Sequence, residues 1–174
     1  MKKLSLIIIA SAFLGLAGQN LNAQTLKFGH IDTEELIQAL PDYDTAVARL
    51  ERYGRELGNF LELMQVELNN KSYEYERNAA NWVDLVKETK ANELQDLNRR
   101  FQEAQQTAQQ QYQDKQIEYL QPLFAKVEKA IQDVGRENGF IYIFAVGQGT
   151  SISYFDETKS TDIMPLAKAK LGVR

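Results

Sequence analysis

The stretch RENGFIYIFAVGQGTSISYFDE, residues 136–157, differs from the long sequence before it, which is helical in pattern. It contains seven consecutive apolar residues, 140–146, and a second β-rich run at 151–155. The glycine-containing segment 147–150 separates the two runs, so together they predict a β-hairpin. A two-stranded hairpin alone is only marginally stable in water, so this one needs further partners.

The expected partner is a short strand at residues 26–31, which alternate apolar and other side chains at a period of two. Strand and hairpin together predict a short antiparallel-type sheet. Residues 140–146 are apolar at every position, so we expect both faces of that strand to be buried. One small protomer cannot cover both faces and the open edges, which predicts oligomerisation through this strand. The candidate interface residues are Phe140, Ile141, Tyr142, Ile143, Phe144 and Val146.

Between these strands the sequence predicts a long antiparallel helical hairpin, a coiled-coil arm, over residues 42–121. Apolar residues recur at heptad spacing along 43–68, and a second apolar stripe runs along 94–134. The Asn-rich segment 78–84 lies midway between the prolines at 41 and 122, which predicts the tip of the arm there. The chain is therefore expected to be mainly α, with a small β body formed by residues 24–41 and 122–174.

Helix boundaries have local signals of their own. Asp32 is a candidate N-cap for a short helix that ends before Pro41, and Pro41 suits the first turn of the next helix. Asn138-Gly139 is typical of a helix C-terminus.

Four positions are candidate hinges of the arm: Pro41, Gly54, Gly58 and Pro122. The prolines mark the base, where we expect both helices to kink or break. The two glycines lie one turn apart, and folding the arm about its tip places them beside Ala104 and Ala108. They indicate either a close contact between the helices or a point at which the arm bends.

The first residues have the pattern of a secretory signal peptide, residues 1–23. Lys2-Lys3 precedes an apolar run at 4–17 that is too short to span a bilayer, and a small residue, Ala23, ends the segment. No later run is long enough to cross a membrane, so we expect no integral membrane segment after cleavage and a location in the periplasm. Losing both lysines takes the formal net charge from −4 to −6, which gives no support for a nucleic-acid partner.

Catalytic signals are weak. The chain has no Cys, and its single His, His30, falls in a predicted strand. Neither thiolate chemistry nor a zinc site has suitable residues, and the segment 147–150 lacks the lysine of a phosphate-binding loop. We therefore expect no enzymatic activity, no metal and no cofactor.

Three segments, in order, resemble the OmpH/Skp family of periplasmic chaperones. They are LKFGHIDTEELIQALPDYDTAVARLE (26–51), LQPLFAKVEKAIQDVGRENGFIYIF (120–144), and ISYF (152–155) with TDI (161–163) after it. The resemblance implies a homotrimer whose β-rich body carries three helical arms around a cavity. It also implies a holdase that keeps unfolded outer-membrane proteins soluble without ATP. The better-known members are strongly basic, whereas this mature chain is acidic.

Two classes of function follow from the sequence: a client-binding chaperone, or a structural coiled-coil spacer or adaptor of the cell envelope. Glycines and prolines interrupt the apolar stripe, which favours adaptable arms over a regular spacer. Trp82, with Tyr73 and Tyr75, is the candidate contact for unfolded clients, because an aromatic ring buries a large apolar area without requiring a particular sequence. The alternative is that Trp82 packs at the corner between the two helices.

Overall fold

The computed structural model describes residues 26–147 and 149–173, so the predicted signal peptide lies outside the described residues. The chain is mainly helical with a small sheet, as predicted. Its elements are β1 (Phe28–Asp32), α2 (Thr33–Gln38), α3 (Pro41–Asn78), the 3-10 helix η1 (Ala79–Asn81), α4 (Asp84–Asn138), β2 (Tyr142–Val146), β3 (Ser160–Asp162) and α5 (Met164–Leu171). Within the described ranges, no helix combines the length and apolar character needed to cross a membrane.

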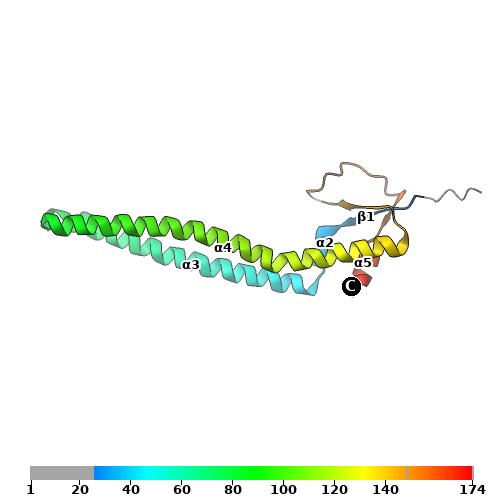
Figure 1. Cartoon of the computed structure of the whole chain (residues 1–174), viewed down its shortest axis with the longest axis horizontal. Coiled ribbons are helices and arrows are strands. Elements are labelled where there is room, and N and C mark those ends of the chain that lie inside the picture. The colour runs from blue at the N-terminus through cyan, green and yellow to red at the C-terminus, as the bar shows by residue number, and fades with distance from the viewer. Residues whose placement is uncertain (1–25, 148, 174) are drawn as a thin grey trace, which may run out of the picture.

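The long helices and the sheet occupy different parts of the molecule. Figure 1 shows the sheet, α2 and α5 gathered around one end of α4, while α3 and the rest of α4 extend away from them. We call the first part the body, and the paired helices with the turn that joins them the arm. At 38 residues, α3 alone is roughly 57 Å long.

The local boundary signals are confirmed. Asp32 caps α2, because its Oδ1 accepts hydrogen bonds from the backbone N–H groups of Glu34 (3.0 Å) and Glu35 (3.1 Å). Pro41 begins α3, where its missing N–H costs nothing. Gly139 ends α4 in the left-handed conformation, with φ of 69°.

The predicted antiparallel sheet is wrong. The strand order is β2-β1-β3, and β1 pairs with both neighbours in parallel. The chain leaves β1 through the two long helices and returns to start β2 at the same end of the sheet, and a connection of this length permits parallel pairing.

The predicted β-hairpin is also wrong, because residues 151–155 form no strand. Gly147 takes a φ of 114° beside Asp32, and the chain then travels back along the sheet so that β3 can start level with β1. The strand that follows β2 in the sequence therefore lies on the opposite edge of the sheet. The glycines that indicated a hairpin turn belong to a crossover connection instead.

The core lies between one face of the sheet and the helices of the body. Ile31, on the central strand, is 1 % exposed. Its buried partners come from every helix that reaches the body: Leu36 and Leu40 before α3, Leu123, Val127 and Val134 from α4, and Ile163, Met164 and Ala167 around α5. Burial of this apolar surface is the main force that holds the body together.

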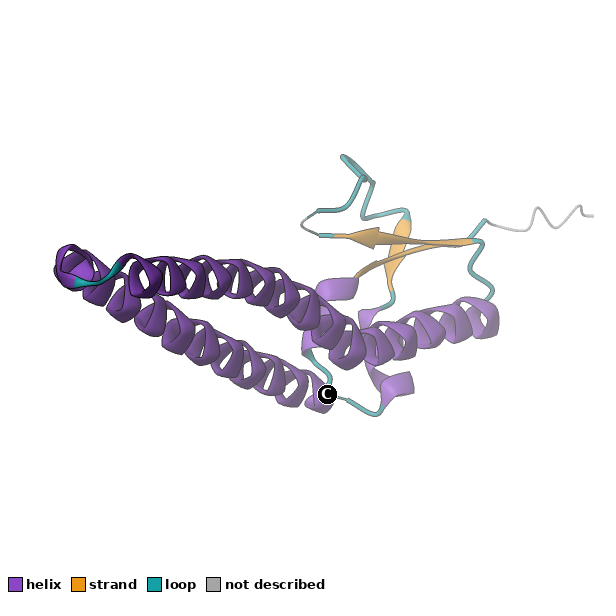
Figure 2. Cartoon of the chain, turned by 60° about the vertical axis from the view of Figure 1, so that its left-hand side comes forward, coloured by secondary structure: helices purple, strands orange, loops and turns teal. Residues whose placement is uncertain are grey.

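The arm is held by contacts between α3 and α4, which lie side by side in both views (Figures 1 and 2). The Tyr53 hydroxyl donates to Gln111 at 3.2 Å, and Lys126 lies 3.7 Å from Asp42 near the base. Leu50, Leu97 and Ala108 are buried between the helices.

The expected break at both prolines is only half right. The helix α3 begins at Pro41, but α4 continues through Pro122 to Asn138. Proline removes the donor to the carbonyl four residues earlier, here that of Glu118. Both Pro122 and Glu118 are exposed, so water can solvate this carbonyl and the helix survives.

Candidate functional site

The first candidate surface is the face of the sheet opposite the helices, which we call the open sheet face. The parallel register pairs Phe28 with Tyr142 and His30 with Phe144, so these four side chains project to one side. The Phe28 ring stacks on Tyr142 at 6.3 Å and on Phe144 at 6.4 Å between centroids. In the single chain Tyr142 is 61 % exposed and Phe144 38 %. A ladder of three stacked rings thus faces solvent.

The only histidine of the chain lies beside this ladder. His30 Nδ1 is 2.9 Å from the Ser160 hydroxyl of β3, and its ring lies 4.7 Å from that of Phe155. The imidazole is therefore hydrogen-bonded and packed on an aromatic ring. Within residues 26–147 and 149–173, no three His, Asp or Glu side chains group closely enough to hold a metal ion.

The six predicted interface residues divide between the two sides of β2. Tyr142 and Phe144 lie on the open sheet face, and Val146 is paired with Asp32 on the same side. Ile141 precedes the strand and is 49 % exposed. Phe140 and Ile143 pack against the core cluster instead. The single chain therefore covers only one face of this strand, and burial of the other face by a second protomer stays a prediction.

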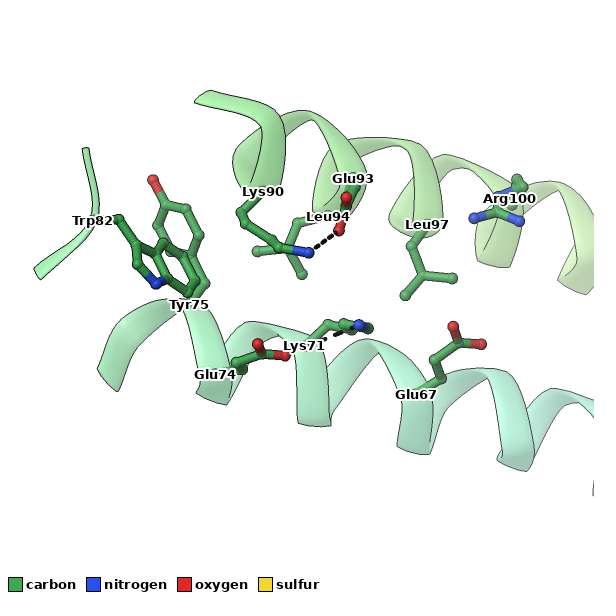
Figure 3. Close-up of a pocket in the computed structure, with 10 residues that line it drawn as sticks. All are labelled: Glu67, Lys71, Glu74, Tyr75, Trp82, Lys90, Glu93, Leu94, Leu97 and Arg100. Atoms are coloured by element: carbon green, nitrogen blue, oxygen red, sulfur yellow. Dashed lines mark hydrogen bonds and ion pairs between the residues drawn. The ribbon is translucent and has the colours of Figure 1, made fainter. Parts of the chain in front are cut away.

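The second candidate surface is a cavity of about 200 Å³ between α3 and α4 near η1, which we call the tip cavity (Figure 3). Leu94 and Leu97 of α4 point into the space between the helices. Leu97 is only 5 % exposed, so it forms an apolar floor. The aromatic rings of Tyr75 and Trp82 close the end nearest the turn.

The two rings at the tip form one packed unit. Tyr75 and Trp82 lie 5.8 Å apart between centroids at an interplanar angle of 68°, the edge-to-face geometry that aromatic pairs prefer. Trp82 is half-buried in this contact. Tyr73, the third client-contact candidate, is 64 % exposed and does not line the cavity. The structure thus brings together two of the three candidates.

Charged side chains surround the apolar lining of the cavity. Three are acidic and three are basic: Glu67, Glu74 and Glu93, with Lys71, Lys90 and Arg100. Lys90 Nζ donates to Glu93 at 2.8 Å, and Lys71 lies 3.9 Å from Glu74. The rim therefore carries both signs in equal number.

These ion pairs also interact across the two helices. The hydrogen bond to Glu93 raises the pKa of Lys90, and the Glu74 carboxylate on the facing helix adds to the effect. The same hydrogen bond lowers the pKa of Glu93, with a contribution from Lys71. Lys90 and Glu93 are consequently both charged at neutral pH.

The hinge glycines differ from the predicted arrangement of small residues against small residues. A Cβ at Gly54 would lie 3.1 Å from the Tyr112 ring, so this glycine makes room for an aromatic side chain rather than an alanine. A Cβ at Gly58 would meet nothing within 4 Å. The two positions therefore have different roles, and only Gly54 lies at a close contact.

Comparison with known families identifies one that has the same extent as the described fold. The family described as "Outer membrane protein (OmpH-like)" matches residues 27–171, from β1 to the end of α5. The chain belongs to the OmpH-like family. This confirms the resemblance noted in the sequence. A search of curated proteins found no match.

The sequence prediction for this OmpH-like chain missed the tip cavity, although a signal for it exists. Lys71 and Glu93 are each eleven residues from Trp82, and Glu74 and Lys90 are each eight residues from it. Folding the chain at Trp82 therefore sets each cation against an anion. Charge reversal about a predicted turn indicates which residues face each other, even where the apolar stripe does not.

Proposed function

We propose that this OmpH-like protein is a periplasmic holdase, a chaperone that binds unfolded outer-membrane proteins without ATP. The observation that carries the proposal is the tip cavity, where two leucines and two aromatic rings line an accessible site at the end of a long arm, remote from the body. A holdase needs such accessible apolar surface and no catalytic group. The predicted signal peptide and the family description support a periplasmic role connected with the outer membrane.

The same proposal includes a homotrimer assembled through the body. The open sheet face offers three stacked rings, and the two outer strands, β2 and β3, each have one edge that no described strand pairs. Uncovered edges and apolar faces of this kind are normally covered in native proteins. Each protomer would then contribute its predicted antiparallel helical hairpin as one arm around a shared cavity.

Apolar side chains along the arm supply further client contacts. Phe60, Leu63 and Val66 of α3 are 54 %, 71 % and 49 % exposed. Many weak apolar contacts suit a chaperone that must hold unrelated unfolded sequences. A spacer or adaptor has no use for such surface on the arm, so the holdase is favoured over the structural alternative.

The test is suppression of aggregation. A urea-unfolded β-barrel membrane protein is diluted into buffer with the mature protein in molar excess, without ATP, and light scattering is followed. We expect scattering to fall as the protein is added and an unrelated helical protein at equal mass to leave it unchanged. A triple variant, Phe60→Ser with Leu63→Ser and Val66→Ser, should suppress less at unchanged helicity. Scattering equal to that of the helical control would exclude the holdase.

A further inference from the structure

We propose that the tip cavity binds one aromatic side chain of an unfolded polypeptide. This deepens the proposed function, on which it rests, by naming the chemical group that the arm holds. In this arrangement the client inserts a ring between α3 and α4. Trp82 then lines the site that receives the ring of the client, and its own side chain does not insert into the client.

The size of the cavity selects the occupant. An apolar cavity of about 150 Å³ is large enough to hold benzene. Sites for complete small-molecule ligands span about 300–1,000 Å³. At about 200 Å³, the tip cavity has room for a single ring.

The residues that line the cavity can contact an inserted ring with both aliphatic and aromatic surface. Leu94 and Leu97 present aliphatic surface, and the edge-to-face pair of Tyr75 and Trp82 presents aromatic surface at the end of the site (Figure 3). The tip cavity opens to solvent, so a client can reach this aliphatic and aromatic surface.

The rim favours a neutral group carried on a peptide. Its three cations and three anions balance, and Lys90 with Glu93 and Lys71 with Glu74 already compensate one another. A charged ligand would therefore gain no net attraction. The same side chains remain 31–48 % exposed, so they can exchange hydrogen bonds with the backbone amides on either side of an inserted ring.

Trp82 makes the site directly measurable, because it is the only tryptophan of the chain. The mature protein is titrated with N-acetyl-phenylalanine amide while Trp82 fluorescence is recorded, and N-acetyl-alanine amide is the control probe. We expect a saturable change with the phenylalanine probe and none with the alanine probe. Leu97→Phe fills the cavity from inside and should weaken binding at least about tenfold, since burial of one aromatic side chain contributes that much.

Leu85→Phe is the matched control, because it makes the same change on α4 at a side chain that is 75 % exposed and does not line the cavity. It should bind the probe like the parent. Leu94→Phe fills the cavity from a second position and replaces Leu97→Phe if that variant loses helicity by circular dichroism.

Failure of this proposal is distinct from failure of the holdase. Aggregation suppression without a saturable response to the phenylalanine probe overturns the cavity site and leaves the holdase standing. An equal response in parent, Leu97→Phe and Leu94→Phe means that the probe contacts Trp82 from outside, which also overturns it. Probe binding that Leu97→Phe abolishes, in a protein that suppresses no aggregation, supports the site and excludes the holdase.

Discussion

The open sheet face and the tip cavity both present aromatic rings, but they differ in what surrounds those rings. Phe28, Tyr142 and Phe144 stack in an unbroken ladder. At the tip, Tyr75 and Trp82 sit behind a rim of six charged side chains. A continuous apolar face gains the most free energy when a large, permanent partner buries it. A small site surrounded by charged side chains limits each contact to one ring. The first arrangement suits assembly and the second suits reversible holding.

The two surfaces also differ in their backbone. The outer strands of the sheet have edges that can pair with another strand. Along the arm, most backbone groups are hydrogen-bonded within α3 and α4, so binding there depends mainly on side chains. A partner at the body can therefore add a row of main-chain hydrogen bonds along a strand edge, which the helical arm does not offer.

The largest effect is expected from Ile143→Asp, which attacks the inner side of β2. Ile143 packs on the core cluster and lies 3.2 Å from a Cβ built at Gly29. A carboxylate at this half-buried position would be partly desolvated without a partner and would lose the apolar contacts, at a cost of about 1–3 kcal/mol. We expect loss of the folded body, measured as a lower urea midpoint by circular dichroism. An unchanged midpoint would mean that this side of the strand is not core.

Phe144→Asp, one residue later, should instead leave the body folded and release monomers. Phe144 lies on the open sheet face, so the charge stays in water until protomers meet. Light scattering should give the monomer mass, with helicity like that of the parent. Leu166→Asp is the control, since it adds the same charge to α5, on the other side of the sheet, at similar exposure (40 %). If the Phe144→Asp variant still forms the oligomer, the interface does not lie on the open sheet face.

The contrast between Ile143 and Phe144 marks what the sequence could and could not predict. Seven apolar residues in a row predicted a strand, and the caps at Asp32, Pro41 and Gly139 were readable because each depends only on its neighbours. Strand direction was not readable, because it depends on where two long helices return the chain. The roles of the strand residues follow from that direction and from the position of the helices.

The tip cavity escaped prediction for a related reason. Heptad spacing identifies the packed stripe of each helix, but a void depends on how the two stripes are aligned. Trp82 was recognised as important from its type alone. Its partners Leu94 and Leu97 looked like ordinary members of the stripe, and only the cross-helix alignment makes them the floor of a site.

A smaller effect is expected from Trp82→Ser, which removes one wall of the tip cavity. Aggregation suppression should weaken several-fold, because the loss is one aromatic contact of at most a few kcal/mol. The mass in solution and the helicity should equal those of the parent. Leu85→Ser is the matched control near the tip, since its side chain is 75 % exposed and lies outside the cavity. If Trp82→Ser and the parent suppress aggregation equally, the tip does not contribute to client binding.

The two arm glycines should differ in a stability measurement. Replacing glycine by alanine in a helix gains about 1 kcal/mol where there is room for the methyl group. Gly58→Ala should approach this value, because nothing lies within 4 Å of its Cβ. Gly54→Ala should gain less, because its Cβ would lie 3.1 Å from the Tyr112 ring. Urea unfolding compares them, and equal gains would mean that the ring yields freely and that Gly54 is not needed for the contact.

The smallest effect concerns charge, and it separates the tip from the sheet face most directly. The hydrogen bond from Lys90 lowers the pKa of Glu93 below its ordinary value of 4.5. Its contribution to stability is therefore fully present above that value and is lost as the pH falls through the lower pKa of the folded state. Glu93→Gln lacks this contribution at every pH. In urea unfolding, the parent should be slightly more stable than Glu93→Gln at neutral pH, and the difference should vanish in acid.

Salt provides the matching control for this last comparison. Added salt should shrink the same difference between the parent and Glu93→Gln, because the pair is exposed and screened. The mass of the proposed trimer should not fall with salt, since the rings of the open sheet face would associate in it by apolar burial. A trimer that dissociates as salt is added would mean that charge holds the body together, and the contrast between the two surfaces would then be lost.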